Sequence, residues 1–186
     1  MKWLVIVFVL LFILSPVLWL RPSPQQKRRM TLRDRLTRQG VTIRETTPPL
    51  HHFKGTMPTY RWFFPAEAPG PTFLLVRDAK ASAALEPYHA GWRWRIAPLR
   101  PLSDKATYHL KRIVEKLPQD ALVLESTPES ISLWWWESQN GERFATYLAD
   151  FEALRDALEG RADKRPIPFN ARVDANATSQ HGSDAR

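Results

Sequence analysis

The longest apolar run of the chain lies near its beginning. Residues 3–20 contain no charged side chain, and Trp3 and Trp19 stand close to the two ends of the run. As a helix the run would extend about 27 Å, which approaches the roughly 30 Å hydrocarbon core of a bilayer. Indole rings favour the membrane interface. The pattern therefore predicts one transmembrane helix over residues 3–20, with Trp3 and Trp19 as membrane anchors.

A cleaved signal peptide is the alternative interpretation of this run. Signal peptides have a shorter apolar core, about 7–15 residues long, and small residues follow it at the cleavage site. In this chain Trp19, Leu20 and Arg21 follow instead. We therefore expect the apolar helix to be retained.

Basic residues crowd the segment that follows, residues 21–40. Lys and Arg resist translocation and attract anionic lipid. This bias predicts a single-pass membrane protein with its N-terminus outside and its domain cytoplasmic. The residues assigned to topology and anionic lipid are Arg21, Lys27, Arg28, Arg29 and Arg33. A short helix is expected over residues 31–39, with a basic face that is either solvated or in contact with anionic lipid or an acidic partner.

The next part of the chain alternates between strand-like and helix-like patterns. Ser103 is expected to cap a helix that runs to Leu117, because apolar residues recur there at helical spacing. A short helix is expected over residues 79–86. Segments rich in aromatic and β-branched residues predict strands at residues 41–45, 60–64, 73–76, 92–96, 121–125 and 131–137.

A turn motif precedes the last predicted elements of the domain. Asn140-Gly141 is typical of a two-residue hairpin turn, which predicts a strand over residues 143–148. Asp150 would then cap a last helix over residues 151–159.

Together these elements predict the fold class. We expect an α+β domain over residues 41–160, with a mostly antiparallel sheet and two main helices, behind the transmembrane helix. Residues 161–186 show no periodicity and predict a disordered tail.

Charge changes the picture because it is unevenly placed. The net charge is +8, and residues 1–44 carry nine Lys or Arg against the single acid Asp34, so the remainder is neutral. A neutral domain lacks the electrostatic footprint of nucleic-acid binding. The absence of cysteine excludes disulfides, zinc-thiolate sites and thiol nucleophiles.

Tryptophan is concentrated in two motifs. Trp92-Arg-Trp-Arg95 resembles the stacking platforms of single-strand binders, but a core strand with a solvated outer face has the same pattern. In Trp134-Trp135-Trp136, a strand must send Trp135 to one face and its two neighbours to the other. We assign Trp135 to the core, and Trp134 and Trp136 to a candidate interaction surface.

No catalytic or metal-binding constellation stands out. His51 and His52 are adjacent and would point apart on a strand, and phosphate-loop, H-E-x-x-H and G-x-S-x-G motifs are missing. We therefore assign no catalytic residue, metal ligand or cofactor.

The segment Leu20-Arg-Pro-Ser-Pro-Gln-Gln-Lys-Arg-Arg29 resembles the exit sequence of the YajC family. In that family an apolar N-terminal helix is followed by R-P-Q-Q-K-R, a short helix that ends in Gly, and a strand; here Gly40 and residues 41–43 continue the same order. The likeness covers about the first 45 residues, and Arg44 to Pro49 replace the family's G-G-I-x-G stretch. The resemblance implies an inner-membrane accessory subunit of the Sec preprotein translocase.

The predicted function is that of a membrane-anchored, non-enzymatic protein that acts through protein contacts. The most specific role that we predict is that of a translocase accessory subunit. The expected partners are the lipid bilayer and the Sec translocase or other membrane proteins, and no nucleic acid. The alternative is a membrane-tethered enzyme or a small-ligand-binding domain.

Overall fold

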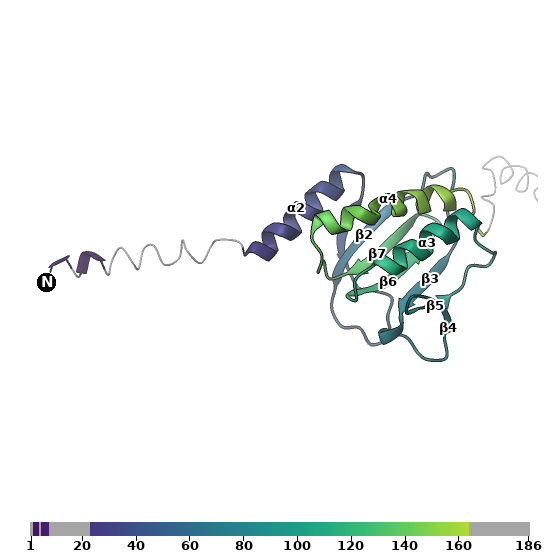
Figure 1. The fold of residues 1–186 in the computed structure, drawn as a ribbon, viewed down its shortest axis with the longest axis horizontal. Helices are drawn as coiled ribbons and strands as arrows, with labels where there is room; N and C mark the ends of the chain where they lie inside the picture. Colours follow the sequence, from purple (N-terminus) through teal and green to yellow (C-terminus); the bar gives the residue numbers. More distant parts are fainter. Residues whose placement is uncertain (1, 4, 8–22, 164–186) are drawn as a thin grey trace, which may run out of the picture.

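The computed structural model describes residues 2–3, 5–7 and 23–163. The folded part is an α+β domain built on a seven-stranded antiparallel sheet with the strand order β1-β2-β7-β6-β3-β5-β4. The strands are β1 (Thr42–Thr46), β2 (Met57–Phe63), β3 (Phe73–Arg77), β4 (Glu86–His89), β5 (Trp92–Ile96), β6 (Ala121–Ser126) and β7 (Ser130–Trp135). The α-helices are α2 (Pro24–Arg38), α3 (Asp104–Lys116) and α4 (Gly141–Leu158), and Asp78–Lys80 form a short 3-10 helix, η1. Helices α3 and α4 lie across one face of the sheet, and α2 lies beside the first turns of α4 (Figure 1).

The membrane predictions require correction. Among the residues that the structure describes, no helix is both long enough and apolar enough to cross a bilayer. Helix α2 carries six Lys or Arg, α3 is only 13 residues long, and α4 contains six charged residues. This finding overturns the predicted fold class with its transmembrane helix, and with it the inner-membrane, single-pass location. Most of the predicted span, including Trp19, lies outside the described residues, and Trp3 is 80% exposed.

Local sequence explains how two of the helices begin. The Ser23 side chain accepts from the Gln26 backbone N–H, and the Gln26 side chain accepts from the Ser23 N–H, which completes a capping box before Pro24. The Ser103 hydroxyl caps α3 in the same way, by accepting from the Ala106 N–H at 3.3 Å. The predicted helix from Ser103 to Leu117 is confirmed.

The predicted hairpin at Asn140-Gly141 is wrong. Asn140 has extended backbone angles and its side chain accepts from the Arg143 N–H at 3.0 Å, so it caps α4. Asparagine favours both a hairpin turn and a helix N-cap, and the apolar residues that follow recur at helical spacing. Asp150, predicted as a cap, lies in the middle of this helix. The predicted short helix over residues 79–86 is also wrong, because only η1 forms there before β4 begins.

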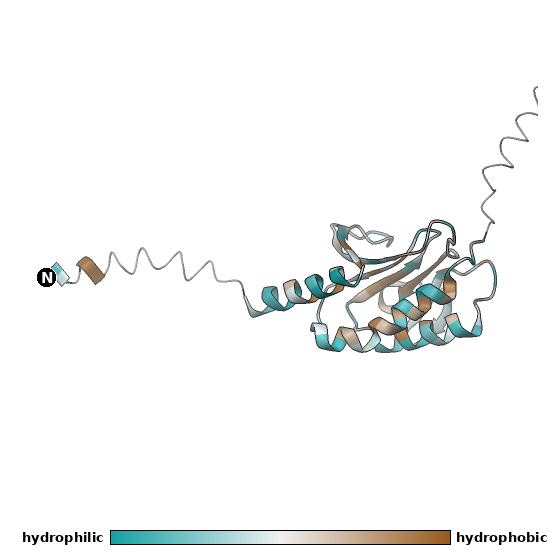
Figure 2. Ribbon diagram, turned by 90° about the horizontal axis from the view of Figure 1, so that it is seen from above, coloured by the Kyte–Doolittle hydropathy of each residue, from teal (hydrophilic) through white to brown (hydrophobic). Residues whose placement is uncertain are grey.

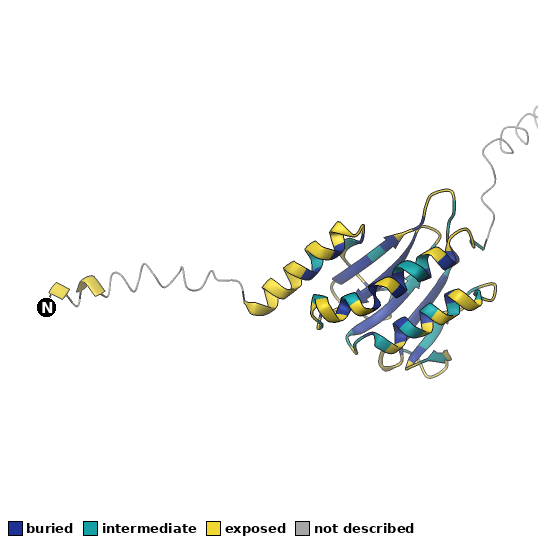
Figure 3. Cartoon of the chain, turned by 45° about the horizontal axis from the view of Figure 1, so that its top comes forward, coloured by how far each residue is buried: buried dark blue, intermediate teal, exposed yellow. Residues whose placement is uncertain are grey.

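The helix-covered face of the sheet holds the main core. The rings of Trp62 and Phe151 stack with centroids 4.2 Å apart and planes 3° apart, and Trp135 stacks on Phe144 at 5.0 Å. Trp135 is fully buried together with Ile131 and Leu133 from the same strand, as predicted. Figure 3 shows that the central strands are largely buried while most of α2 is exposed.

The other face of the sheet carries a smaller core. Figure 2 shows the helices gathered on one side of the sheet, so chain segments other than α-helices cover this second side. Residues 47–56 contribute Leu50 and Phe53 to the cover. Arg95 fixes the segment by donating to the Pro49 carbonyl at 2.5 Å. The buried residues beneath are Met57, Leu74, Val76, Leu122, Val123 and Trp134.

The tail prediction is mostly untested. Residues 164–186 lie outside the described residues. The Asp163 carboxylate accepts from the Thr72 backbone N–H at 3.1 Å, so the chain stays attached to the domain at least to that residue.

Candidate functional site

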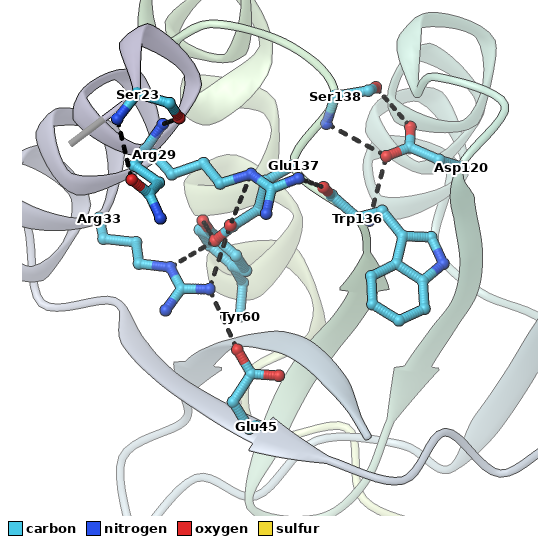
Figure 4. Close-up of polar contacts among 10 residues, drawn as sticks. Ser23, Arg29, Arg33, Glu45, Tyr60, Asp120, Trp136, Glu137 and Ser138 are labelled. Atoms are coloured by element: carbon cyan, nitrogen blue, oxygen red, sulfur yellow. Dashed lines mark hydrogen bonds and ion pairs between the residues drawn. The ribbon is translucent and has the colours of Figure 1, made fainter. Parts of the chain in front are cut away.

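A buried carboxylate lies where helix α2 meets the sheet. Glu137 follows β7 with a left-handed φ of 58°, and its side chain is completely buried. Arg33 donates to it twice, with Nε 2.6 Å from Oε1 and Nη2 3.0 Å from Oε2, and the Tyr60 hydroxyl donates to Oε1 at 2.7 Å (Figure 4). A buried charge is costly unless it is paired and hydrogen-bonded. Glu137 meets both conditions and therefore fixes α2 to the domain.

Two further contacts complete this network. Arg33 also donates to Glu45 at 3.1 Å, and Arg29 donates to the Trp136 carbonyl at 3.3 Å with its Nε 3.8 Å from Glu137. The hydrogen bond to Glu137 raises the pKa of Arg33 above its already high value, although burial opposes the rise. Burial, and then the negative charge of Glu137, raise the pKa of Tyr60 well above its usual value. Tyr60 therefore remains a hydrogen-bond donor at neutral pH.

This geometry divides the predicted basic cluster. Arg29 and Arg33, assigned from the sequence to topology and anionic lipid, are turned toward Glu137. Arg21 lies outside the described residues. No sequence motif singles out Glu137, and the one available signal for this site is the i, i+4 spacing of Arg29 and Arg33, which places both on one face of a helix.

The remaining cations of α2 face outward. Arg38 pairs with Asp34 at 2.6 Å. Within the described part of the chain, the side chains of Lys27, Arg28 and Arg35 make no ion pair or hydrogen bond, and all three are exposed.

These three cations line a groove of about 440 Å³ between α2 and the first turn of α4. Its other lining residues are Thr31, Leu32, Asn140, Gly141 and Glu142. Glu142 is the single acid among them, so the lining carries a net charge of +2. The N-terminus of α4 adds the positive end of a helix dipole. Arg28 and Asn140 also line a neighbouring cavity of about 270 Å³ that reaches Glu137.

A wider depression between α3 and α4 has mixed charge. It measures about 750 Å³ and is lined by Glu115, Glu142, Lys116 and Arg143, among others. The opposite charges balance there, so this depression selects for no particular ligand charge. The groove beside α2 has the clearer chemical preference.

The two tryptophans of the predicted interaction surface lie in different environments. Trp134 is 3% exposed beneath residues 47–56, and its Nε1 donates to the Thr46 hydroxyl at 3.0 Å. Trp136 is 44% exposed, with its ring centroid 6.5 Å from that of Phe53. Asp120 holds its backbone by accepting from the Trp136 N–H at 3.0 Å (Figure 4). Only Trp136 is accessible to a partner.

The arginines of the Trp92-Arg-Trp-Arg95 motif are bound within the chain. Arg93 pairs with Asp78 and donates to the Leu85 carbonyl at 2.9 Å, and Arg95 donates to Pro49. Among the described residues, no three His, Asp or Glu side chains lie close enough together to hold a metal ion.

Comparison with protein-family models, with curated proteins and with solved structures found no match. The resemblance to the YajC family therefore remains an expectation from the first 45 residues.

Proposed function

We propose that this protein is a binding protein whose groove between α2 and α4 holds an acidic segment of a partner protein. The observation that carries the proposal is the division of charge on α2. Arg29, Arg33 and Arg38 are each paired with an acid of the same chain. Lys27, Arg28 and Arg35 have no such partner among residues 23–163, and they share one groove.

The dimensions of the groove suit an extended peptide. Lys27 and Arg35 are eight residues apart, which corresponds to about 12 Å along a helix. An extended chain covers that distance in about four residues. An acidic segment of four or five residues would therefore meet all three cations at once. Each solvent-exposed pair contributes about 0.2–1 kcal/mol, so we expect weak, salt-sensitive binding with fast electrostatic association.

The lining supports binding rather than catalysis. It contains no His, and its one hydroxyl, that of Thr31, already donates to the Lys27 carbonyl at 2.9 Å. General acid–base chemistry needs a titratable group within reach of the substrate proton. Glu142 is the sole carboxylate of the groove, and it lacks a neighbouring base or nucleophile among the lining residues.

The test uses a fluorescent nonapeptide of alternating Asp and Gly, with the Asn-Gly peptide as its uncharged match. Fluorescence anisotropy should show binding of the acidic peptide to the full chain at 50 mM salt, and at least tenfold weaker binding at 300 mM. A triple variant, Lys27→Gln, Arg28→Gln and Arg35→Gln, should bind at least tenfold more weakly than the wild type.

The matched control removes the same charge elsewhere. Lys54, Lys105 and Lys111 are exposed and lie outside the groove, so replacing all three by Gln should change peptide affinity less than twofold. Equal losses in both triple variants would show that only net charge matters. Binding of anionic vesicles through the same three cations, without binding of the peptide, would also contradict the proposal.

A further inference from the structure

A row of three polar residues crosses the sheet on the face opposite α3 and α4. Arg61 of β2 is the cross-strand partner of Ser132 in β7, and Ser132 is the partner of Glu125 in β6. Neighbouring strands lie about 4.8 Å apart, so the backbones that carry Arg61 and Glu125 are about 10 Å apart. The small side chain of Ser132 between them leaves a slot with a guanidinium on one side and a carboxylate on the other.

The slot has measurable volume. It forms part of a cavity of about 360 Å³, whose lining also includes Ser130, Thr127, Pro128 and Glu129. Phe63, the cross-strand partner of Ser130, lies on the same face and is 47% exposed. A polar floor therefore adjoins an accessible aromatic ring.

Both charged side chains in the slot are half-buried and lack a hydrogen-bond partner among the described residues. The Nε atom of Arg61 is buried without a hydrogen-bond partner. The Glu125 carboxylate makes no hydrogen bond and no ion pair among the described residues, and burial raises its pKa while the charge of Arg61 opposes the rise. A buried polar atom without a partner costs about 1–3 kcal/mol, and this cost applies to the Arg61 Nε, whereas the Glu125 carboxylate reaches solvent.

Elsewhere the fold satisfies its buried charges. Arg77 donates to the carbonyls of Leu117, Pro118 and Ala121. Glu137 accepts from Arg33 and Tyr60. The Nε of Arg61 lacks a hydrogen-bond partner, as do the buried ring nitrogens of Trp62, Trp92 and Trp135, but Arg61 borders a cavity that a ligand can enter.

We infer that the slot between Arg61 and Glu125 binds a free α-amino acid with an apolar side chain. The ligand's carboxylate would accept from the Arg61 guanidinium, a pairing that is strong because it is charge-assisted. Its ammonium group, one carbon away, would donate to Glu125, and the Ser130 and Ser132 hydroxyls lie beside both. An apolar side chain would cover the exposed ring of Phe63. One end of a peptide could not pair with both Arg61 and Glu125, because it carries either an ammonium group or a carboxylate but not both.

This inference is independent of the acidic-peptide groove, which lies between α2 and α4. Loss of amino-acid binding would leave peptide binding intact, and the reverse also holds.

The test is isothermal titration of the full chain with L-leucine, alongside leucine methyl ester and N-acetyl-leucine. The ester lacks the carboxylate charge and the acetyl compound lacks the ammonium charge, so each should bind at least tenfold more weakly than leucine. Arg61→Gln and Glu125→Gln should each weaken leucine binding at least tenfold.

The control is Arg44→Gln, because Arg44 is exposed on the same face of the sheet and lies outside the cavity lining. That variant should bind leucine as the wild type does. Thermal melts of each variant establish that it is folded. Absence of heat up to 10 mM leucine with folded wild-type protein would overturn the inference, as would equal binding of leucine and its two derivatives.

Discussion

The two faces of the sheet are built on different principles. On the helix side, large rings stack against α4, and the charged groups Glu137 and Asp150 are paired within the chain. On the opposite side, a connecting segment forms the cover, and the half-buried Arg61 and Glu125 make no hydrogen bond to another described residue. The first face therefore buries its charges in pairs, and the second face keeps a cavity beside charged side chains. The three consecutive tryptophans lie in three environments: Trp135 in the core under the helices, Trp134 in the smaller core on the opposite face, and Trp136 at the surface.

The largest test of this comparison is replacement of Trp135 by alanine. The ring is fully buried against Tyr60 and Phe144, so its loss should cost about 3–5 kcal/mol of unfolding free energy. Trp134→Ala should cost about half as much, because a single connecting segment covers that ring. Trp136→Ala should cost under about 1 kcal/mol. Chemical denaturation measures all three, and equal losses would erase the distinction between the two faces.

The next largest effect should come from Arg33→Met. This change leaves Glu137 buried without its bidentate partner, and breaking a buried pair costs about 3–5 kcal/mol. Arg33 is partly exposed and Arg29 lies nearby, so we expect about 2–3 kcal/mol. The control on the same helix is Arg38→Met, whose exposed pair with Asp34 should be worth about 0.3–0.5 kcal/mol. Similar denaturant midpoints for the two variants would contradict the role of Glu137.

A smaller effect, with a defined pH dependence, is expected for Asp150 on the helix side. Burial alone would raise its pKa, but hydrogen bonds from Lys116 and His109 lower it below the usual range. Because the folded pKa is depressed, the stabilisation is present above the unfolded pKa and is lost as pH falls through the folded value. Asp150→Asn should cost about 1 kcal/mol at pH 7. The difference from wild type should disappear in acid, as pH melts would show.

The smallest effect should have the opposite sign, at Glu125 on the open side. Burial raises the pKa of this carboxyl, so the folded state binds its proton more readily, and stability falls as pH rises above the unfolded pKa. Glu125→Gln removes this cost and should stabilise the protein at pH 7 by about 0.5 kcal/mol. Near about pH 3 the carboxyl is protonated in both states, and variant and wild type should melt alike. A destabilised variant at pH 7 would contradict the unpaired state of Glu125.

Local patterns predicted the elements whose periodicity is strong. The helix α3 and the strand that places Ile131, Leu133 and Trp135 in the core followed from spacing alone. The α4 start did not, because Asn140-Gly141 satisfies both a hairpin and a capping signal, and packing of the Phe144 and Phe151 rings decides between them.

The candidate sites were harder to predict because their partners are distant in sequence. Arg33 and Glu137 are 104 residues apart, and no local pattern links them. The burial of Trp134 depends on Leu50 and Phe53, which lie about 80 residues earlier in the chain. Likewise, the Arg61 and Glu125 slot depends on the register of three strands.

The strand order also has a consequence for how the chain folds during synthesis. The hairpin β1–β2 joins the sheet only through β7, which is made about 70 residues later. Such distant pairings close slowly, because a long loop must be ordered first. Both α2 and the groove beside it depend on Glu137 and α4, near the end of the domain. A nascent chain that ends before residue 140 therefore exposes the basic residues of α2 without a groove, and the binding proposed for that groove would require the last helix.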